Sequence, residues 1–169
     1  MTSSRGTGLA RIAGLIAVIA GIVFIIAGGV TWGMVTSQLK AENITVPEDA
    51  AFLGGAEVQG PLSAYAQADI INTHALAGTE GRTYAELGGA MREVEPGSPE
   101  HEELQAQRDS VMNASFLRAS LFTSVVSYGV AALVIGLGAL LILLGLGMRQ
   151  LAAEPATAVA AEPRREPAH

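Results

Sequence analysis

The sequence predicts an all-α membrane protein: a two-helix transmembrane hairpin with a small, mostly helical extracytoplasmic segment and a disordered C-terminal tail. Three features predict it: two long uncharged stretches, the placement of the basic residues, and the composition of the C-terminal end. The uncharged stretches are Ile12–Leu39 and Ala119–Met148. Each exceeds the roughly 20 apolar residues that cross a bilayer core about 30 Å thick. Two isolated segments cannot close a barrel, so both must be helices whose backbone groups pair internally.

The basic residues predict the orientation of the hairpin. Arg5 and Arg11 precede the first stretch, and Arg149, Arg164 and Arg165 follow the second. Because Lys and Arg near span ends favour the cytoplasmic side, we expect both termini inside and the loop outside, with the protein in the plasma membrane. The loop carries thirteen acidic residues against four basic ones, which argues against nucleic acid as a partner of this face.

The N-terminal part of the chain is expected to stay in the membrane. Residues 1–8 form a short cytoplasmic start, and residues 9–39 form the first transmembrane helix. A cleaved signal peptide is the alternative, but the apolar stretch is longer than the usual ~7–15 residues and no A-x-A site follows it. Trp32 is typical of an anchor at the membrane–water interface.

The extracytoplasmic loop, residues 40–115, begins with an irregular strap over residues 43–60. Pro61 is suited to the first turn of a helix that ends near Gly78. Thr83 and Glu86 have the spacing of a capping box, and we expect the two glycines that follow, Gly88 and Gly89, to cut that helix short.

A single long helix is expected to connect the loop with the second span. Ser98 is a good N-cap and Pro99 is pre-organised for the first helical position. We therefore expect one continuous helix from about residue 99 through the second transmembrane segment, residues 116–148. Residues 149–169 are rich in Ala, Pro, Glu and Arg, and this composition predicts a disordered cytoplasmic tail.

Small residues recur along both spans at spacings that favour close helix packing. The first span also has a separate pair at four-residue spacing, Gly29 and Gly33. The second span has a series at seven-residue spacing, Ala131, Gly138 and Gly145. Packing of the two spans against each other is the first interpretation, and pairing with another subunit is the second. The residues predicted to pack are Ala13, Ala17, Gly21, Ala132 and Gly136.

Four hydroxyl side chains form a polar stripe at helical spacing in the second span: Ser120, Thr123, Ser124 and Ser127. In an antiparallel hairpin they lie at the depth of Thr31 and Thr36 of the first span. In the first interpretation these hydroxyls form hydrogen bonds within the hairpin, either across to the other helix or to their own backbone. In the second they contact a partner or a lipid.

The composition argues against enzyme chemistry. The chain contains no cysteine, which excludes disulfides and thiolate metal sites. Its three histidines are His74, His101 and His169, and their positions predict solvated surface residues rather than an iron site. No nucleotide-binding or hydrolase motif occurs. We predict no catalytic residue, cofactor or metal, and no enzymatic activity.

Three segments, residues 31–39, 61–71 and 113–124, resemble a group of small actinobacterial two-span membrane proteins. The resemblance covers about Ile12–Met148, so the tail lies outside it. Members of that group often carry the label "aromatic ring-opening dioxygenase". Such enzymes hold a histidine-rich metal site in a soluble domain. This chain has too few histidines and too small a soluble part to form such a site. The resemblance therefore implies a two-span envelope protein and transfers no catalytic residue.

These observations predict a non-enzymatic accessory or structural subunit that docks onto a larger membrane or envelope complex. The expected partners are the lipid bilayer and other membrane protein subunits or a second copy of the chain. The candidate contact residues in the loop are Leu62, Tyr65, Ile70 and Ile71. The alternative is a free-standing membrane-anchored module that binds or senses a small ligand or cell-wall fragment.

Overall fold

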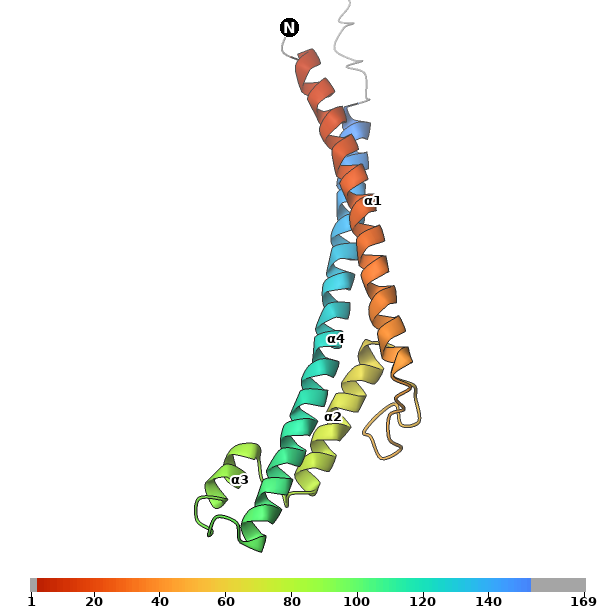
Figure 1. Cartoon of the computed structure of the whole chain (residues 1–169). Helices are drawn as coiled ribbons and strands as arrows, with labels where there is room; N and C mark the ends of the chain where they lie inside the picture. Colours follow the sequence, from red (N-terminus) through yellow and green to blue (C-terminus); the bar gives the residue numbers. More distant parts are fainter. Residues whose placement is uncertain (1–2, 153–169) are drawn as a thin grey trace, which may run out of the picture. The chain divides into compact units, whose positions relative to one another are not determined.

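A computed structural model describes residues 3–152, with side chains from residue 8 onward. The chain forms four helices, α1 (Ser3–Ala41), α2 (Pro61–Ala77), α3 (Tyr84–Ala90) and α4 (Pro99–Leu151), labelled in Figure 1. Within residues 3–152 no β-strand occurs, and an isolated antiparallel bridge joins Thr45 and Glu57. The all-helical prediction is therefore confirmed for this part of the chain.

Helices α1 and α4 are long and apolar enough to cross a membrane. The most apolar window of each has a mean hydropathy of 2.7, yet only 11% of the window in α1 and 17% of that in α4 is buried inside the protein. The core helix of a soluble protein is mostly buried, so the apolar side chains here face outward instead. Two candidate transmembrane helices are thus present, as the sequence predicted.

Both long helices extend beyond their predicted bounds. Helix α1 begins at Ser3 rather than near residue 9, and α4 continues to Leu151 rather than ending at residue 148. At the C-terminal end, the Arg11 guanidinium donates a hydrogen bond to the Ala152 carbonyl at 2.9 Å, which supplies a partner for a carbonyl that the helix leaves unpaired. The rest of the predicted tail, residues 153–169, lies outside the described residues, as do residues 1 and 2.

The described chain divides into two compact units, and each is considered by itself. The first unit combines the part of α1 up to Ile26 with the part of α4 from Val134 onward. Here the two helices run antiparallel, and glycines face one another along the contact. A Cβ atom added to Gly14 would lie 2.6 Å from the Gly145 carbonyl oxygen, and one added to Gly138 would lie 2.6 Å from that of Gly21. The backbones therefore approach more closely than any larger residue allows.

The second unit, Ala27–Leu133, packs the end of α1, the strap, α2 and the middle of α4 around one core. Helix α2 lies within this core, and its buried side chains are mostly small and not confined to one face. Ala64, Ala66 and Ala68 are all at most 1% exposed. Positions two apart point to different sides of a helix, so α2 is covered from more than one side. The remaining core residues are Leu39, Val46, Val58, Leu121 and Tyr128.

The strap between α1 and α2 folds back on itself. The Val46 N–H donates to the Ala56 carbonyl and the Val58 N–H donates to the Ile44 carbonyl, both at 2.9 Å. Gly55, at φ +75°, lies in the left-handed region, and a Cβ there would meet the Glu48 carboxylate. The strap is irregular, as predicted, but its two arms are joined by backbone hydrogen bonds.

The expected helix starts are found, and α3 is short, as the sequence predicts. Thr83 caps α3, because its hydroxyl accepts from the Glu86 N–H and the Glu86 carboxylate accepts from the Thr83 N–H. Ser98 caps α4 through a bond from the His101 N–H. The prediction that Gly88 and Gly89 cut this helix short is confirmed, since α3 has seven residues and ends at Ala90, directly after the two glycines. Packing of Leu87 against α4 stabilises this helix despite the low helix propensity of glycine.

Candidate functional site

Tyr128 of α4 joins three segments in the second unit. Its side chain is 1% exposed, its hydroxyl lies 2.7 Å from the Thr36 hydroxyl of α1, and it donates to the Gln59 carbonyl of the strap at 3.3 Å. The Trp32 ring packs against it edge to face, with 4.7 Å between ring centroids. Sequence reasoning did not single out Tyr128, although it is the one tyrosine in the uncharged stretch Ala119–Met148.

The polar stripe mostly bonds to its own helix. The Thr123 and Ser127 hydroxyls donate to the carbonyls four residues earlier at 2.8 Å, and Ser124 does so at 3.4 Å. This is one of the two interpretations that the sequence left open, and it uses the donor of each of these three hydroxyls, while their oxygens can still accept. Ser120, the fourth member, lines a cavity instead.

The loop residues proposed as partner contacts are separated by the fold. Leu62 is 69% exposed and Tyr65 is 45% exposed, whereas Ile70 is buried and Ile71 is half-buried. Tyr65 is in contact with two other rings, at centroid distances of 6.1 Å to Phe52 and 5.9 Å to Phe122. Leu62 and Tyr65 are therefore available to a partner, and Ile70 belongs to the interior.

The small residues proposed for helix packing are also separated. Gly21 lies in the α1–α4 contact of the first unit. Ala13, Ala132 and Gly136 are exposed, and Ala17 is half-buried. The reason is the period of the contact: its glycines recur every seven residues, at 14 and 21 and at 138 and 145, rather than every four. A seven-residue period keeps one side of each helix facing the other.

A cavity of about 440 Å³ opens beside α2 in the second unit, and we call it the Gln67 cavity. Its apolar wall comes from α1, the strap, α2 and α4, and consists of Leu39, Ile44, Ile71, Leu117 and Leu121. Most small-molecule sites have this character, an apolar wall with a few polar groups.

Three polar residues complete the lining of the Gln67 cavity: Glu42, Gln67 and Ser120. The side-chain carbonyl oxygen of Gln67 is buried and has no hydrogen-bond partner among the described residues. A buried acceptor without a partner costs free energy on the order of 1–3 kcal/mol. Because this oxygen has almost no accessible surface, a ligand in the cavity does not reach it.

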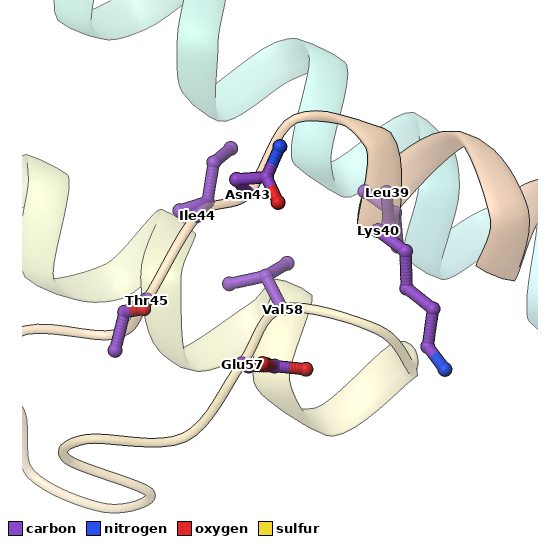
Figure 2. Close-up of a pocket in the computed structure, with 7 residues that line it drawn as sticks. All are labelled: Leu39, Lys40, Asn43, Ile44, Thr45, Glu57 and Val58. Atoms are coloured by element: carbon purple, nitrogen blue, oxygen red, sulfur yellow. The ribbon is translucent and has the colours of Figure 1, made fainter.

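A smaller pocket of about 280 Å³ lies at the end of α1 (Figure 2), and it shares Leu39 and Ile44 with the Gln67 cavity. Lys40 of α1 and Glu57 of the strap both border it, as does the buried Val58. A cation and an anion thus line the same pocket. This mixed lining selects no particular ligand charge.

The two histidines within the described residues stand apart. His74 Nε2 lies 2.7 Å from Asp49 Oδ2, and the hydrogen bond from His74 lowers the pKa of the Asp49 carboxyl. Both side chains are at least half exposed. His101 lies in the first turn of α4. Among the described residues no group of three or more His, Cys, Asp and Glu could hold a metal ion, and His169 lies outside them.

Comparisons with known protein families, with curated proteins and with solved structures gave no match for this chain. Any functional assignment must therefore come from the residues and their geometry.

Proposed function

We propose that this chain is a non-enzymatic, two-span plasma-membrane protein that docks as an accessory subunit onto another membrane protein. In this arrangement α1 and α4 form a transmembrane hairpin with both termini in the cytoplasm. The strap, α2, α3 and the start of α4 form an extracytoplasmic cap.

Charged and aromatic side chains support these membrane boundaries. About 20 residues separate Arg11 from Trp32 on α1, and about 20 separate Tyr128 from Arg149 on α4, which is ~30 Å of helix in each case. Arginine favours the cytoplasmic end of a span, and Trp and Tyr favour the interface. Both spans therefore have the same length between a basic end and an aromatic end.

The observation that carries the docking proposal is the free pair Gly29 and Gly33 on α1. Both glycines are exposed, and a Cβ atom added to either would meet nothing within 4 Å. Their four-residue spacing is the small-xxx-small pattern that lets transmembrane helices approach closely. The glycines at 14 and 21 are already used in the contact with α4. The Gly29–Gly33 face is thus available to a helix of another subunit.

The experiment that tests docking is an affinity purification of the tagged full chain in mild detergent, with and without Gly33→Leu. We expect the native chain to co-purify with a membrane protein at fixed stoichiometry. Gly33→Leu should reduce recovery of that partner at least tenfold, because a leucine side chain separates the two backbones. Mass spectrometry of the eluate measures the ratio.

A matched control is Gly8→Leu, since Gly8 also has open surroundings but lies near the N-terminal end of α1. This variant should retain the partner. A native chain that elutes alone would contradict the proposal, as would a partner that Gly33→Leu retains in full. Elution as a homo-oligomer that Gly33→Leu dissociates would identify the other subunit as a second copy.

The second candidate function is a membrane-anchored binding or sensing module, and the Gln67 cavity favours it. A module of this kind needs no stoichiometric protein partner. The same purification therefore distinguishes the two functions.

A further inference from the structure

Two arginines line one pocket of about 400 Å³ between α1 and α4 in the first unit, and we call it the arginine pocket. Its lining consists of Arg11, Ile12 and Leu15 of α1 and Arg149 of α4. Within residues 3–26 and 134–152, the described residues of this unit, the sequence has no Asp or Glu. The described part of the unit therefore supplies no carboxylate to balance the two guanidinium groups, and the ligand complementary to them is an anion.

Contacts between the two helices orient both arginine side chains. The Arg11 guanidinium donates to the Ala152 carbonyl at 2.9 Å, and a guanidinium has further N–H donors for a ligand. The aliphatic stem of Arg149 lies against Gly14 of α1, since a Cβ atom added to this glycine would be 2.8 Å from the Arg149 Cγ. Two guanidinium groups in one pocket suit a phosphate, whose oxygens accept charge-assisted and often bidentate hydrogen bonds from arginine.

The apolar side chains next to the arginines indicate that this phosphate belongs to a lipid. Ile12 and Leu15 of the pocket are exposed. Ile16 and Ile19, further along α1, are exposed as well. Residues three, four and seven positions apart share one side of a helix, so an apolar strip leads from the arginines toward the middle of the span. An acyl chain can lie along this strip while its headgroup stays at the arginines, whereas a soluble anion gains nothing from it.

We infer that the arginine pocket binds the phosphate group of an anionic phospholipid in the cytoplasmic leaflet. Arg11 and Arg149 donate hydrogen bonds to the phosphate oxygens, and the apolar strip covers the first part of an acyl chain. Basic pockets between transmembrane helices on the cytoplasmic side are suited to anionic headgroups, because anionic lipids give that surface a negative potential. This inference rests on the proposed insertion with both termini in the cytoplasm, but it is independent of docking through Gly29 and Gly33.

Native mass spectrometry of the full chain in mild detergent tests the inference. The protein is titrated with dioctanoyl phosphatidylglycerol or with dioctanoyl phosphatidylcholine, whose choline group cancels the charge of the phosphate. We expect half-saturation by the glycerol lipid at about a tenfold lower concentration, the order of effect that two basic residues have on an anionic lipid. Arg11→Gln and Arg149→Gln should each reduce this preference about threefold, and the double variant should abolish it.

Matched controls separate the arginine pocket from the net charge of the chain. Arg92→Gln makes the same change at an exposed residue of the second unit, and Lys40→Gln removes an exposed positive charge at the other end of α1. Both controls should keep the preference. Because Arg11 also bonds to Ala152, Arg149→Gln is the deciding variant in case Arg11→Gln lowers the unfolding temperature in detergent.

Equal half-saturation by the two lipids would overturn the inference, as would a preference that the double variant retains. A loss of preference in Arg92→Gln and Lys40→Gln as large as in the pocket variants would also overturn it. Inorganic phosphate that displaces the glycerol lipid at equal concentration would identify a soluble anion as the ligand instead. Carbonate washing of membranes separates these failures from failure of the proposed insertion: a chain that washes off contradicts the insertion itself.

Discussion

At the scale of single residues, Tyr128 shows how one polar group organises an apolar environment. Its hydroxyl contacts Thr36 of α1 and Gln59 of the strap, while its ring packs against Trp32. A tyrosine hydroxyl that is buried needs a partner, and here it has one on each of two segments. The residue therefore connects the middle of α4 with the C-terminal part of α1 and with the strap just before α2.

Removal of this hydroxyl should loosen the second unit. We expect Tyr128→Phe to lower the free energy of unfolding by about 1–2 kcal/mol, because the Thr36 hydroxyl and the Gln59 carbonyl both lose a partner. Thermal unfolding in detergent, followed by circular dichroism, measures the change. Tyr84→Phe is the control: Tyr84 is 38% exposed, and its ring contact with Arg108 at 4.0 Å does not depend on the hydroxyl. Equal effects of the two variants would contradict this role of Tyr128.

At the scale of elements, the contact between α1 and α4 in the first unit depends on glycine. Added Cβ atoms at Gly21 and Gly138 would each lie within 3 Å of the opposing backbone carbonyl. The opposing atoms are backbone atoms that cannot rotate away, so the helices themselves would have to separate. Contacts this close allow the extensive van der Waals packing that holds helices together in lipid.

Two glycine substitutions should therefore differ in effect. Gly21→Leu should destabilise the chain by about 1–3 kcal/mol or more, since it overfills a closed contact. Gly136→Leu should change the free energy of unfolding by less than about 0.5 kcal/mol, because a Cβ there meets nothing within 4 Å. Unfolding in detergent by a denaturant series measures both. A larger loss for Gly136→Leu would mean that the α1–α4 contact has the four-residue period instead.

At the scale of the whole molecule, the proposal concerns which side of the membrane each part occupies. The chain contains no cysteine, so a single introduced thiol reports its own location without background. Glu103 on the expected cap and Gln150 at the expected cytoplasmic end are both exposed positions on α4.

We expect Glu103→Cys to react with a membrane-impermeant maleimide in intact cells. Gln150→Cys should react only after the cells are lysed, because positively charged span ends stay in the cytoplasm. A gel shift of the labelled protein measures both reactions. The opposite pattern would reverse the orientation, and labelling of both residues in intact cells would contradict the two-span arrangement.

Much of the helical architecture could be predicted from local patterns. The Pro61 start of α2, the Thr83 capping box and the Ser98 cap of α4 are local hydrogen-bonding and dihedral preferences, and all three are present in the structure. Helix α3 includes Gly88 and Gly89 but ends one residue later, at Ala90; packing of the buried Leu87 offsets the helix propensity cost of glycine, about 1 kcal/mol per residue, over this short length.

The candidate site could be predicted only in part. The small residues of a helix can match several spacings at once, and the sequence does not show which spacing the contact with the other helix follows. Four-residue spacing selected Ala132 and Gly136, which are exposed, whereas the contact uses Gly138 and Gly145. Gln67 was missed altogether, because nothing in the residues around it signals that its carbonyl is buried without a partner.

The sequence by itself determined that this protein is helical and that two of its helices are apolar enough to span a membrane. Both properties follow from local composition and from the need of every backbone group for a partner. Only the tertiary structure decided which glycines meet, which hydroxyls bond to their own helix, and that a cavity opens beside α2. These features depend on the register between segments far apart in the chain, and a register is a property of packing rather than of any one segment.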